Sequence, residues 1–332
     1  MNNRSAIALF SGGLDSILAV KILQEQGIKV HPVFFSTPYI YPDRALKFAA
    51  KNGLQLDVFE ISSEHLEMMK APRYGFGKRF NPCIDCHGLM FAQAAALLPR
   101  YEADFLVSGE VVGQRPMSQR REALQSVGKL SGNADLIVRP LSQKLLPDTL
   151  PIREGWVDKN LLLDISGRGR QRQMELAKKY GLNFPGPGGG CLLTDPSFSL
   201  RLRELVSHGQ ETTAQIALLR WGRHFRLSPT LKLIVGRHKA DNERLYEQNF
   251  PGLWLRLRDS EGPLGLLTDT QASSEQIALA ASILLFYANK APSPAWVKYS
   301  VDNKRWHDIE VEKCPETLLR GIMITVQKDL RC

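Results

Sequence analysis

The chain has 332 residues, of which 43% are hydrophobic and 23% charged, which excludes a fibrous, collagen-like or wholly disordered protein and suggests about two domains. No stretch approaches the ~18 uninterrupted apolar residues of a membrane-spanning helix, and the N-terminal residues lack the apolar region of a signal peptide, so we expect a cytoplasmic protein without a membrane partner. Lysine and arginine number 43 against 34 aspartates and glutamates, and the net charge of +9 fits either an ordinary basic surface or a polyanionic partner.

The first part of the chain alternates short apolar runs with helical segments. We expect strands at residues 6–10, 30–35, 56–61 and 105–107, with helices at 17–23 and 44–52. The first run is apolar throughout, as in parallel strands covered on both faces. Strands that alternate with helices predict a doubly wound parallel α/β sheet, which we assign to a domain over residues 1–210.

The pattern changes from about residue 200. We expect helices at 200–205, 212–219 and 274–287, and short strands at 231–235, 253–257, 264–268, 296–301 and 321–326. These elements predict a second, smaller α+β domain over residues 225–332.

A glycine loop follows the first strand and opens the first helix, with Ser11, Gly12, Gly13, Asp15 and Ser16 as its candidate binding residues. Glycines allow backbone N–H groups to turn inward as an anion-binding nest, and the helix start adds positive potential. The serine hydroxyls can donate to phosphate oxygens, and we expect the aspartate to hold Mg²⁺ on a pyrophosphate. The alternative is a tight turn that caps a helix.

Ser-Gly-Gly-x-Asp-Ser at this place resembles the PP-loop ATP pyrophosphatase superfamily, whose fold is that of adenine nucleotide α-hydrolases. The resemblance implies that ATP is cleaved to AMP and pyrophosphate. AMP is transferred to a carbonyl or ureido oxygen, and a nucleophile then displaces it. Amidotransferases, synthetases and RNA thiolases share the motif, so it does not choose the acceptor.

Three cysteines form a second group of candidate residues: Cys83 and Cys86 in a Cys-x-x-Cys pair, and Cys191 after the glycine-rich run 186–190. The odd total of five cysteines argues against a disulfide framework. Three thiolates suit a [4Fe–4S] cluster with one open iron, or a catalytic zinc. Two alternatives are a thiol nucleophile with a persulfide carrier, and buried small hydrophobes.

A third motif, Gly-Glu-x-x-Gly-Gln, follows the fourth expected strand. Ligands of open α/β sheets bind outside the carboxyl ends of strands. Gly109 would let the backbone approach ATP, Glu110 would orient a ribose or a metal, and Gln114 would hold phosphate or RNA. The alternative is a polar loop that opens a helix.

This motif and residues 137–141 resemble tRNA 4-thiouridine synthetases, and together with the glycine loop and Cys191 the resemblance covers roughly residues 5–205. It implies that a uridine of tRNA is adenylated and that sulfur, from sulfide or a sulfur-donor protein, displaces AMP. Some RNA-thiolating members bind a [4Fe–4S] cluster through three cysteines, which Cys83, Cys86 and Cys191 match. Its open iron is thought to hold the incoming sulfide. The 332 residues contain neither the N-terminal RNA-binding domains of the bacterial enzymes nor the C-terminal sulfur-carrier domain that many have, which favours the cluster route.

Basic residues supply the candidate RNA contacts: Arg168, Arg170, Arg172, Arg223 and Arg237. The first three lie within five residues, and the fourth lies among cations interleaved with aromatic residues, which is typical of RNA recognition. Solvated helix faces and core packing are the alternatives. Residues 236–245 resemble the RNA-binding module of ribosome-quality-control proteins, which implies that the second domain binds RNA.

The leading prediction is therefore an ATP-dependent tRNA thiolase, with ATP, Mg²⁺ and a [4Fe–4S] cluster as cofactors and a homodimer as a possible assembly. Asp15 and the three cysteines are its candidate catalytic residues. One alternative is a PP-loop ligase or amidase that acts on a small molecule and carries zinc at the cysteines. Another is a non-catalytic RNA-binding protein that senses ATP.

Overall fold

The computed structural model describes residues 4–188 and 190–325. The chain divides into two compact units, one up to Thr194 and one from Asp195. The division lies upstream of the expected domain boundary, so the helix that follows Asp195 belongs to the second unit. None of the helices within the described ranges is long and apolar enough to cross a membrane.

The first unit alternates strands and helices, as predicted. Its strands are β1 (Ser5–Leu9), β2 (Lys29–Ser36), β3 (Asp57–Glu60), β4 (Phe105–Ser108) and β5 (Ile137–Val138). Its helices are α1 (Leu14–Gln24), α2 (Asp43–Lys51), α3 (Ser62–Lys70), α4 (Cys83–Ala96), α5 (Leu98–Tyr101), α6 (Arg121–Ser131), α7 (Leu150–Arg153) and α8 (Gln171–Lys179). Short 3-10 helices lie at η1 (Ala134–Leu136), η2 (Gln143–Leu145), η3 (Lys159–Leu161) and η4 (Leu192–Thr194).

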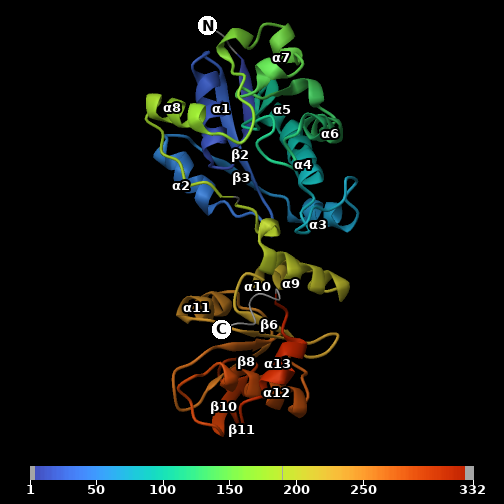
Figure 1. Cartoon of the computed structure of the whole chain (residues 1–332), viewed down its shortest axis with the longest axis vertical. Helices are drawn as coiled ribbons and strands as arrows, with labels where there is room; N and C mark the ends of the chain where they lie inside the picture. Colours follow the sequence, from blue (N-terminus) through green and yellow to red (C-terminus); the bar gives the residue numbers. More distant parts are fainter. Residues whose placement is uncertain (1–3, 189, 326–332) are drawn as a thin grey trace. The chain divides into compact units, whose positions relative to one another are not determined.

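The five strands form one parallel sheet in the order β3-β2-β1-β4-β5. Alternate strand residues enter two cores: Ala6 and Ala8 pack with α1, α2 and α8, whereas Ile7 packs with α4 and α6. Helices therefore cover both faces, as Figure 1 shows, and the predicted doubly wound α/β fold is confirmed. The chain reverses its direction of strand addition between β1 and β4, which makes the carboxyl ends of these strands the expected ligand crevice.

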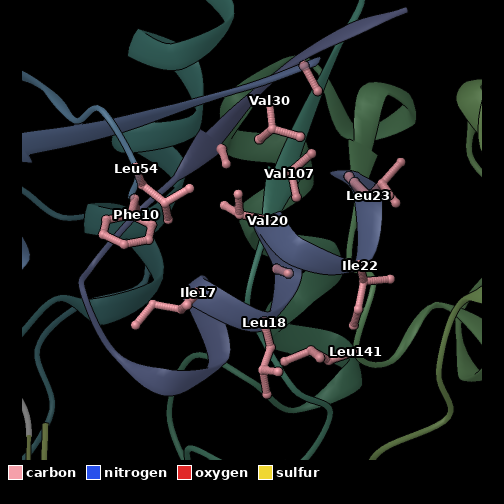
Figure 2. Close-up of a cluster of buried hydrophobic side chains, with 14 of the residues drawn as sticks. Phe10, Ile17, Leu18, Val20, Ile22, Leu23, Val30, Leu54, Val107 and Leu141 are labelled. Atoms are coloured by element: carbon pink, nitrogen blue, oxygen red, sulfur yellow. The ribbon is translucent and has the colours of Figure 1, made fainter. Parts of the chain in front are cut away.

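Helix α1 is the central helix of the first core. Its residues Ile17, Leu18 and Val20 are almost fully buried, and Val107 of β4 packs in the same cluster (Figure 2). A helix that is apolar on most of its faces must be covered on most of them. This burial fixes the start of α1, and with it the glycine loop, against the sheet.

The second unit has an antiparallel sheet. Its strands are β6 (Arg223–Arg226), β7 (Lys232–Val235), β8 (Leu253–Leu257), β9 (Gly265–Leu267), β10 (Ala295–Ser300) and β11 (His307–Val311). Its helices are α9 (Pro196–Ser207), α10 (Thr213–Leu218), α11 (Lys239–Glu247), α12 (Ser274–Phe286) and α13 (Glu316–Ile322). The strand order is β11-β10-β8-β9-β7-β6, and the predicted second sheet domain is confirmed.

Each face of this sheet has its own core. Leu255 and Leu267 pack with α12 on one face, and Trp254 and Leu266 pack with α10 and α11 on the other. The expected strand at 321–326 is wrong over its first residues, because α13 continues to Ile322. Its apolar run is too short to separate a strand from a helix end by periodicity.

Candidate active site

The glycine loop lies at the carboxyl end of β1, between that strand and α1. Gly12 has a φ of +69°, and a Cβ atom there would lie 2.6 Å from the Ala45 Cα, so only glycine fits. The Ser16 hydroxyl donates to the Gly13 carbonyl (2.9 Å), and the Ser11 and Ser16 hydroxyls lie 3.3 Å apart. Both hydroxyls therefore sit at the start of α1, where an anion is favoured.

Gly109 brings the end of β4 against this loop. A Cβ atom there would lie 2.6 Å from the backbone of Asp15 and Ser16. The Gly-Glu-x-x-Gly-Gln motif therefore meets the glycine loop at the carboxyl ends of β1 and β4.

Asp15 is held by a chain of two glutamines. The Gln114 amide donates to Asp15 Oδ2 (2.6 Å), and the buried Gln173 amide of α8 donates to the Gln114 oxygen (3.1 Å). Burial raises the pKa of Asp15 above its ordinary value, although the hydrogen bond from Gln114 opposes this rise. The charges of Arg170 and Arg115 also oppose it, so both arginines lie within electrostatic range of this carboxylate.

Several buried polar atoms near this crevice have no hydrogen-bond partner in the described structure: Asp15 Oδ1, Gln119 Oε1, Arg139 Nη2, Arg170 Nε and Gln173 Oε1. Buried polar atoms are rarely left unpaired unless a ligand, an ion or water satisfies them. The free carboxylate oxygen fits a hard cation such as Mg²⁺, and the free arginine nitrogens fit phosphate oxygens.

The three cysteines lie within electrostatic range of one another although Cys191 lies far along the chain. Cys83 and Cys86 are three residues apart at the start of α4, so both lie on one face of its first turn. Burial raises the pKa of the Cys86 thiol well above its ordinary value, and the charges of Cys191 and Cys83 raise it further. Burial, opposed by nearby backbone N–H groups, raises the pKa of Cys191 to about 11, and the charge of Cys83 adds to this rise.

Contacts around the thiols fix their place. Asn81 donates to Cys83 Sγ (3.0 Å), and a ring nitrogen of buried His65 lies 3.3 Å from Cys86 Sγ. Cys191 forms a β-bridge with Ile40, and the Arg44 guanidinium donates to the Gly186 carbonyl (3.0 Å). The glycine-rich run is therefore attached to the helix that packs against Gly12.

The donor set fits a metal centre with three protein ligands. Three cysteine thiols are the groups that a zinc ion or an iron–sulfur cluster binds as thiolates. As they are placed, no group of three or more histidine, cysteine, aspartate or glutamate side chains among the described residues could itself hold a metal ion. The chemistry of the donors, rather than a finished coordination geometry, supports the site.

Glu110 is engaged on both of its oxygens. It accepts from His87 Nδ1 (2.8 Å) and from Arg139 Nε (2.9 Å), and its side chain is buried. Burial alone would raise the pKa of Glu110, but the charge of Arg139 and the hydrogen bond from His87 lower it to about 2. Glu110 thus orients His87, the neighbour of Cys86, by contacts within the protein.

The five arginines predicted to bind RNA lie in different settings. Arg168 is exposed, Arg170 faces Asp15, and Arg172 pairs with Asp164 (2.6 Å). In the second unit, the Arg223 guanidinium lies 4.3 Å from the Tyr287 ring centroid, and Arg237 donates through two nitrogens to the Asp241 carboxylate. Arg170 therefore belongs with the nucleotide loop.

Sequence reasoning missed Arg115, Gln173, His65 and Asn81 as site residues. Arg115 follows Gln114 and Asn81 lies two residues before Cys83, so both could have been found from the motifs beside them. His65 and Gln173 lie on helices, α3 and α8, whose place beside the site follows only from the sheet order.

Comparison with known proteins finds two kinds of relative. A family model described as the NFACT protein RNA binding domain matches residues 222–320. A tRNA-specific 2-thiouridylase, MnmA of Petrotoga mobilis, is 31% identical over 133 residues, which cover 33% of this chain. The chain spans 36% of that relative's length.

Among solved structures, a 4-thiouridine synthetase in complex with RNA and ATP is 19% identical and matches 64% of this chain and 53% of its own, with a TM-score of 0.38. A predicted tRNA methyltransferase subunit of Methanocaldococcus jannaschii is 16% identical and matches 53% of this chain and 76% of its own, with a TM-score of 0.33. The chain is thus similar to a tRNA-thiolating enzyme over a third of its length and to an RNA-binding domain over residues 222–320, and both predicted resemblances are confirmed.

Proposed function

We propose that the chain is an ATP-dependent tRNA-thiolating enzyme that converts a uridine to 4-thiouridine. One set of contacts supports the proposal: Gly109 packs on the backbone of Asp15, and the adjacent Glu110 accepts a hydrogen bond from His87, the neighbour of Cys86, so the nucleotide loop adjoins the helix of the cysteine pair. Adenylation takes place at the carbonyl oxygen of the base and sulfur transfer at the carbon bonded to it, so the groups for both steps must lie together.

The first step is adenylation of the uracil carbonyl oxygen. This oxygen attacks the α-phosphorus of ATP, and pyrophosphate leaves. The backbone N–H groups at the start of α1 and the hydroxyls of Ser11 and Ser16 bind phosphate oxygens, and Asp15 holds Mg²⁺. Arg115 and Arg170 neutralise the charge that develops on the leaving pyrophosphate.

The second step is displacement of AMP by sulfur. A hydrosulfide attacks the activated carbon, the C–S bond forms, the C–O bond breaks, and AMP leaves with the oxygen. Cys83, Cys86 and Cys191 are the residues that would hold a [4Fe–4S] cluster. When bound, a cluster with one iron free of protein ligands supplies a place for inorganic sulfide.

The choice of 4-thiouridine rests on the motif of residues 108–119, whereas the matched thiouridylase acts, by its name, at position 2 of the base. The RNA-binding family match supports tRNA as the partner of the second unit, and Arg223 and Arg237, which lie within the matched residues, stay predicted RNA contacts. The sulfur enters as sulfide or from a donor protein, and a homodimer stays a prediction.

The test is nucleoside mass spectrometry on tRNA from a strain with the gene disrupted, complemented by variants of the full chain. We expect loss of 4-thiouridine, recovery with the intact gene and with Cys314→Ala, and no recovery with Cys191→Ala. Cys314 is the matched control, because it is a buried cysteine of the second unit. Loss of 2-thiouridine instead would reassign the position, and an unchanged profile in a strain without a second thiolase would overturn the proposal.

Metal analysis of anaerobically purified protein tests the cofactor separately. We expect about four irons per chain, lost in Cys191→Ala and kept in Cys314→Ala. Zinc in place of iron would favour a PP-loop ligase that acts on a small molecule.

A further inference from the structure

The segment between α3 and α4, residues 71–80, has a composition unlike its neighbours; we call it the aromatic–basic loop. It contains no acidic residue and three cations, Arg73, Lys78 and Arg79, all of them exposed. Tyr74 is 42% exposed and Phe76 38% exposed. Large aromatic faces and cations are thus presented to solvent from one short segment (Figure 1, between α3 and α4).

The loop is fixed to the helix that carries the cysteine pair. Buried Asp85 on the first turn of α4 accepts backbone N–H groups from Arg73 (2.7 Å) and Tyr74 (3.1 Å). The Gly77 N–H donates to the Asn81 carbonyl (3.0 Å), and Gly77 packs closely on the Met117 side chain, which would have to move to admit a Cβ atom. The exposed aromatic residues are therefore held in place rather than left on a loose segment.

The aromatic rings are also ordered among themselves. Phe80 has a φ of +61°, a left-handed conformation that a bulky residue adopts only when its surroundings hold it there. Its ring stacks on Phe76 with centroids 4.1 Å apart and planes at 16°. Phe76 is thus part of a stacked pair and still partly exposed, so a further flat group has aromatic surface on which to pack.

The loop reaches the thiols through one side chain. The Asn81 amide donates to Cys83 Sγ (3.0 Å) and also contacts Met117 Sδ (3.4 Å). The Asn81 side-chain oxygen accepts the Arg79 N–H (3.2 Å). The loop is thus two hydrogen bonds from a candidate ligand of the metal centre.

We propose that the aromatic–basic loop is the surface by which the first unit holds unpaired nucleotides of its RNA substrate. Phe76 and Tyr74 stack on bases, and Arg73, Lys78 and Arg79 contact phosphates. Unpaired nucleotides are the occupant because stacking on a side chain needs an exposed base face, and a segment with three cations and no acidic residue in its sequence suits a polyanion. This inference rests on the proposed function and names how the first unit meets its RNA.

The test measures single-turnover thiolation of unmodified tRNA by the full chain, with inorganic sulfide as the sulfur source. We expect Phe76→Ala to raise the tRNA concentration for half-maximal rate on the order of tenfold, with ATP binding unchanged, because one base loses its stacking partner. Leu161→Ala, at a site 57% exposed in the first unit, is the matched control and should change neither.

A salt series isolates the charge of the loop. Lys78→Gln should lower the slope of log affinity against log salt by about one, and Lys129→Gln, on an exposed position of α6, should leave the slope unchanged. Ultraviolet cross-linking of the unaltered chain to tRNA adds a direct readout. We expect a nucleotide adduct on the tryptic peptide Tyr74–Lys78, which holds both exposed aromatic residues.

Adducts confined to other peptides, with Phe76→Ala and Lys78→Gln binding tRNA like the unaltered chain, would overturn the inference while thiolation by that chain upheld the proposed function. If the loop variants thiolate tRNA more slowly only with a protein sulfur donor, and not with sulfide, the inference is overturned and the loop is assigned to binding that donor. If the unaltered chain makes no thionucleoside, the proposed function fails, and the cross-link still decides whether the loop contacts RNA. Tyr74→Ala replaces Phe76→Ala if the latter does not fold.

Discussion

Gly12 shows how one residue can decide whether the nucleotide loop forms. Its positive φ and the nearby Ala45 backbone exclude any side chain. We predict that Gly12→Ala lowers the free energy of unfolding by at least about 2 kcal/mol and abolishes ATP binding. Thermal melts and calorimetric titration with ATP measure both.

Gly13→Ala is the control for this change, because Gly13 has a negative φ and a Cβ atom there would meet only the Ser11 hydroxyl, at 3.3 Å. We expect a stability loss under about 1 kcal/mol. Equal losses in the two variants would show that the close approach to Ala45 does not limit the loop.

Glu110 gives the site a pH dependence whose direction is fixed by its lowered pKa. With a folded pKa of about 2 against an ordinary 4.5, its contribution to stability is present above pH 4.5 and is lost as the pH falls from there towards 2. Between pH 5 and 3 the unaltered chain should lose about 2 kcal/mol more stability than Glu110→Gln.

Denaturant titrations at several pH values measure this difference. At neutral pH, Glu110→Gln should itself cost about 3 kcal/mol, because it leaves the Arg139 guanidinium buried without a counter-charge. If the free energy of unfolding changes with pH in the same way in both proteins, Glu110 is not the charged, paired group described here.

Among the elements, α9 is tied to β6 and β7 by a partly buried carboxylate. Glu204 accepts from Arg226 and from Lys232 (3.1 Å), whose side chain is 1% exposed. Burial lowers the pKa of Lys232 to about 8 although Glu204 opposes the change. We predict that Glu204→Gln lowers the free energy of unfolding by about 3 kcal/mol, because the buried Lys232 ammonium loses its counter-charge.

Lys232→Met is the matched change on the other side of this ion pair. It removes a buried charge and keeps an apolar side chain of similar length, so stability should stay within about 1 kcal/mol of the unaltered chain. If Lys232→Met lowers the free energy of unfolding as much as Glu204→Gln does, the lysine rather than the carboxylate holds α9 to the sheet. Chemical unfolding of both variants at pH 7 distinguishes these outcomes.

Most strands and the helices α1, α2, α9, α10 and α12 follow from the sequence pattern, because their apolar periodicity is set by burial within each element. The strand β6 does not: Arg223–Arg226 is a polar run with the composition of a surface contact, yet His224 and Phe225 are fully buried. Residues 321–326 fail for the opposite reason, since an apolar run of that length suits either a strand or the end of α13.

The residues of the candidate site likewise divide into those that a sequence pattern reveals and those that only the fold brings to the site. Its loop motifs could be found because Ser11–Ser16 and residues 108–114 carry their chemistry in consecutive positions. The hydrogen bond of Gln173 to Gln114, and the position of Arg170 just before α8, depend on α8 packing beside α1, which no local pattern encodes.

For the whole molecule, the separate cores predict two unfolding events. Ile17 and Phe91 belong to clusters made only of first-unit residues, whereas Leu255 and Trp254 belong to clusters made only of second-unit residues. Scanning calorimetry should resolve two transitions. Gly12→Ala should lower only one of them and Glu204→Gln only the other; a joint shift would show that the units unfold as one.

The β-bridge between Ile40 and Cys191 has a consequence for the order of events during synthesis. The cysteine pair at the start of α4 leaves the ribosome long before Cys191, which is among the last residues of the first unit to emerge. The metal centre proposed above could therefore be completed only after almost the entire first unit has been translated, and until then the cysteine pair lacks its third thiol.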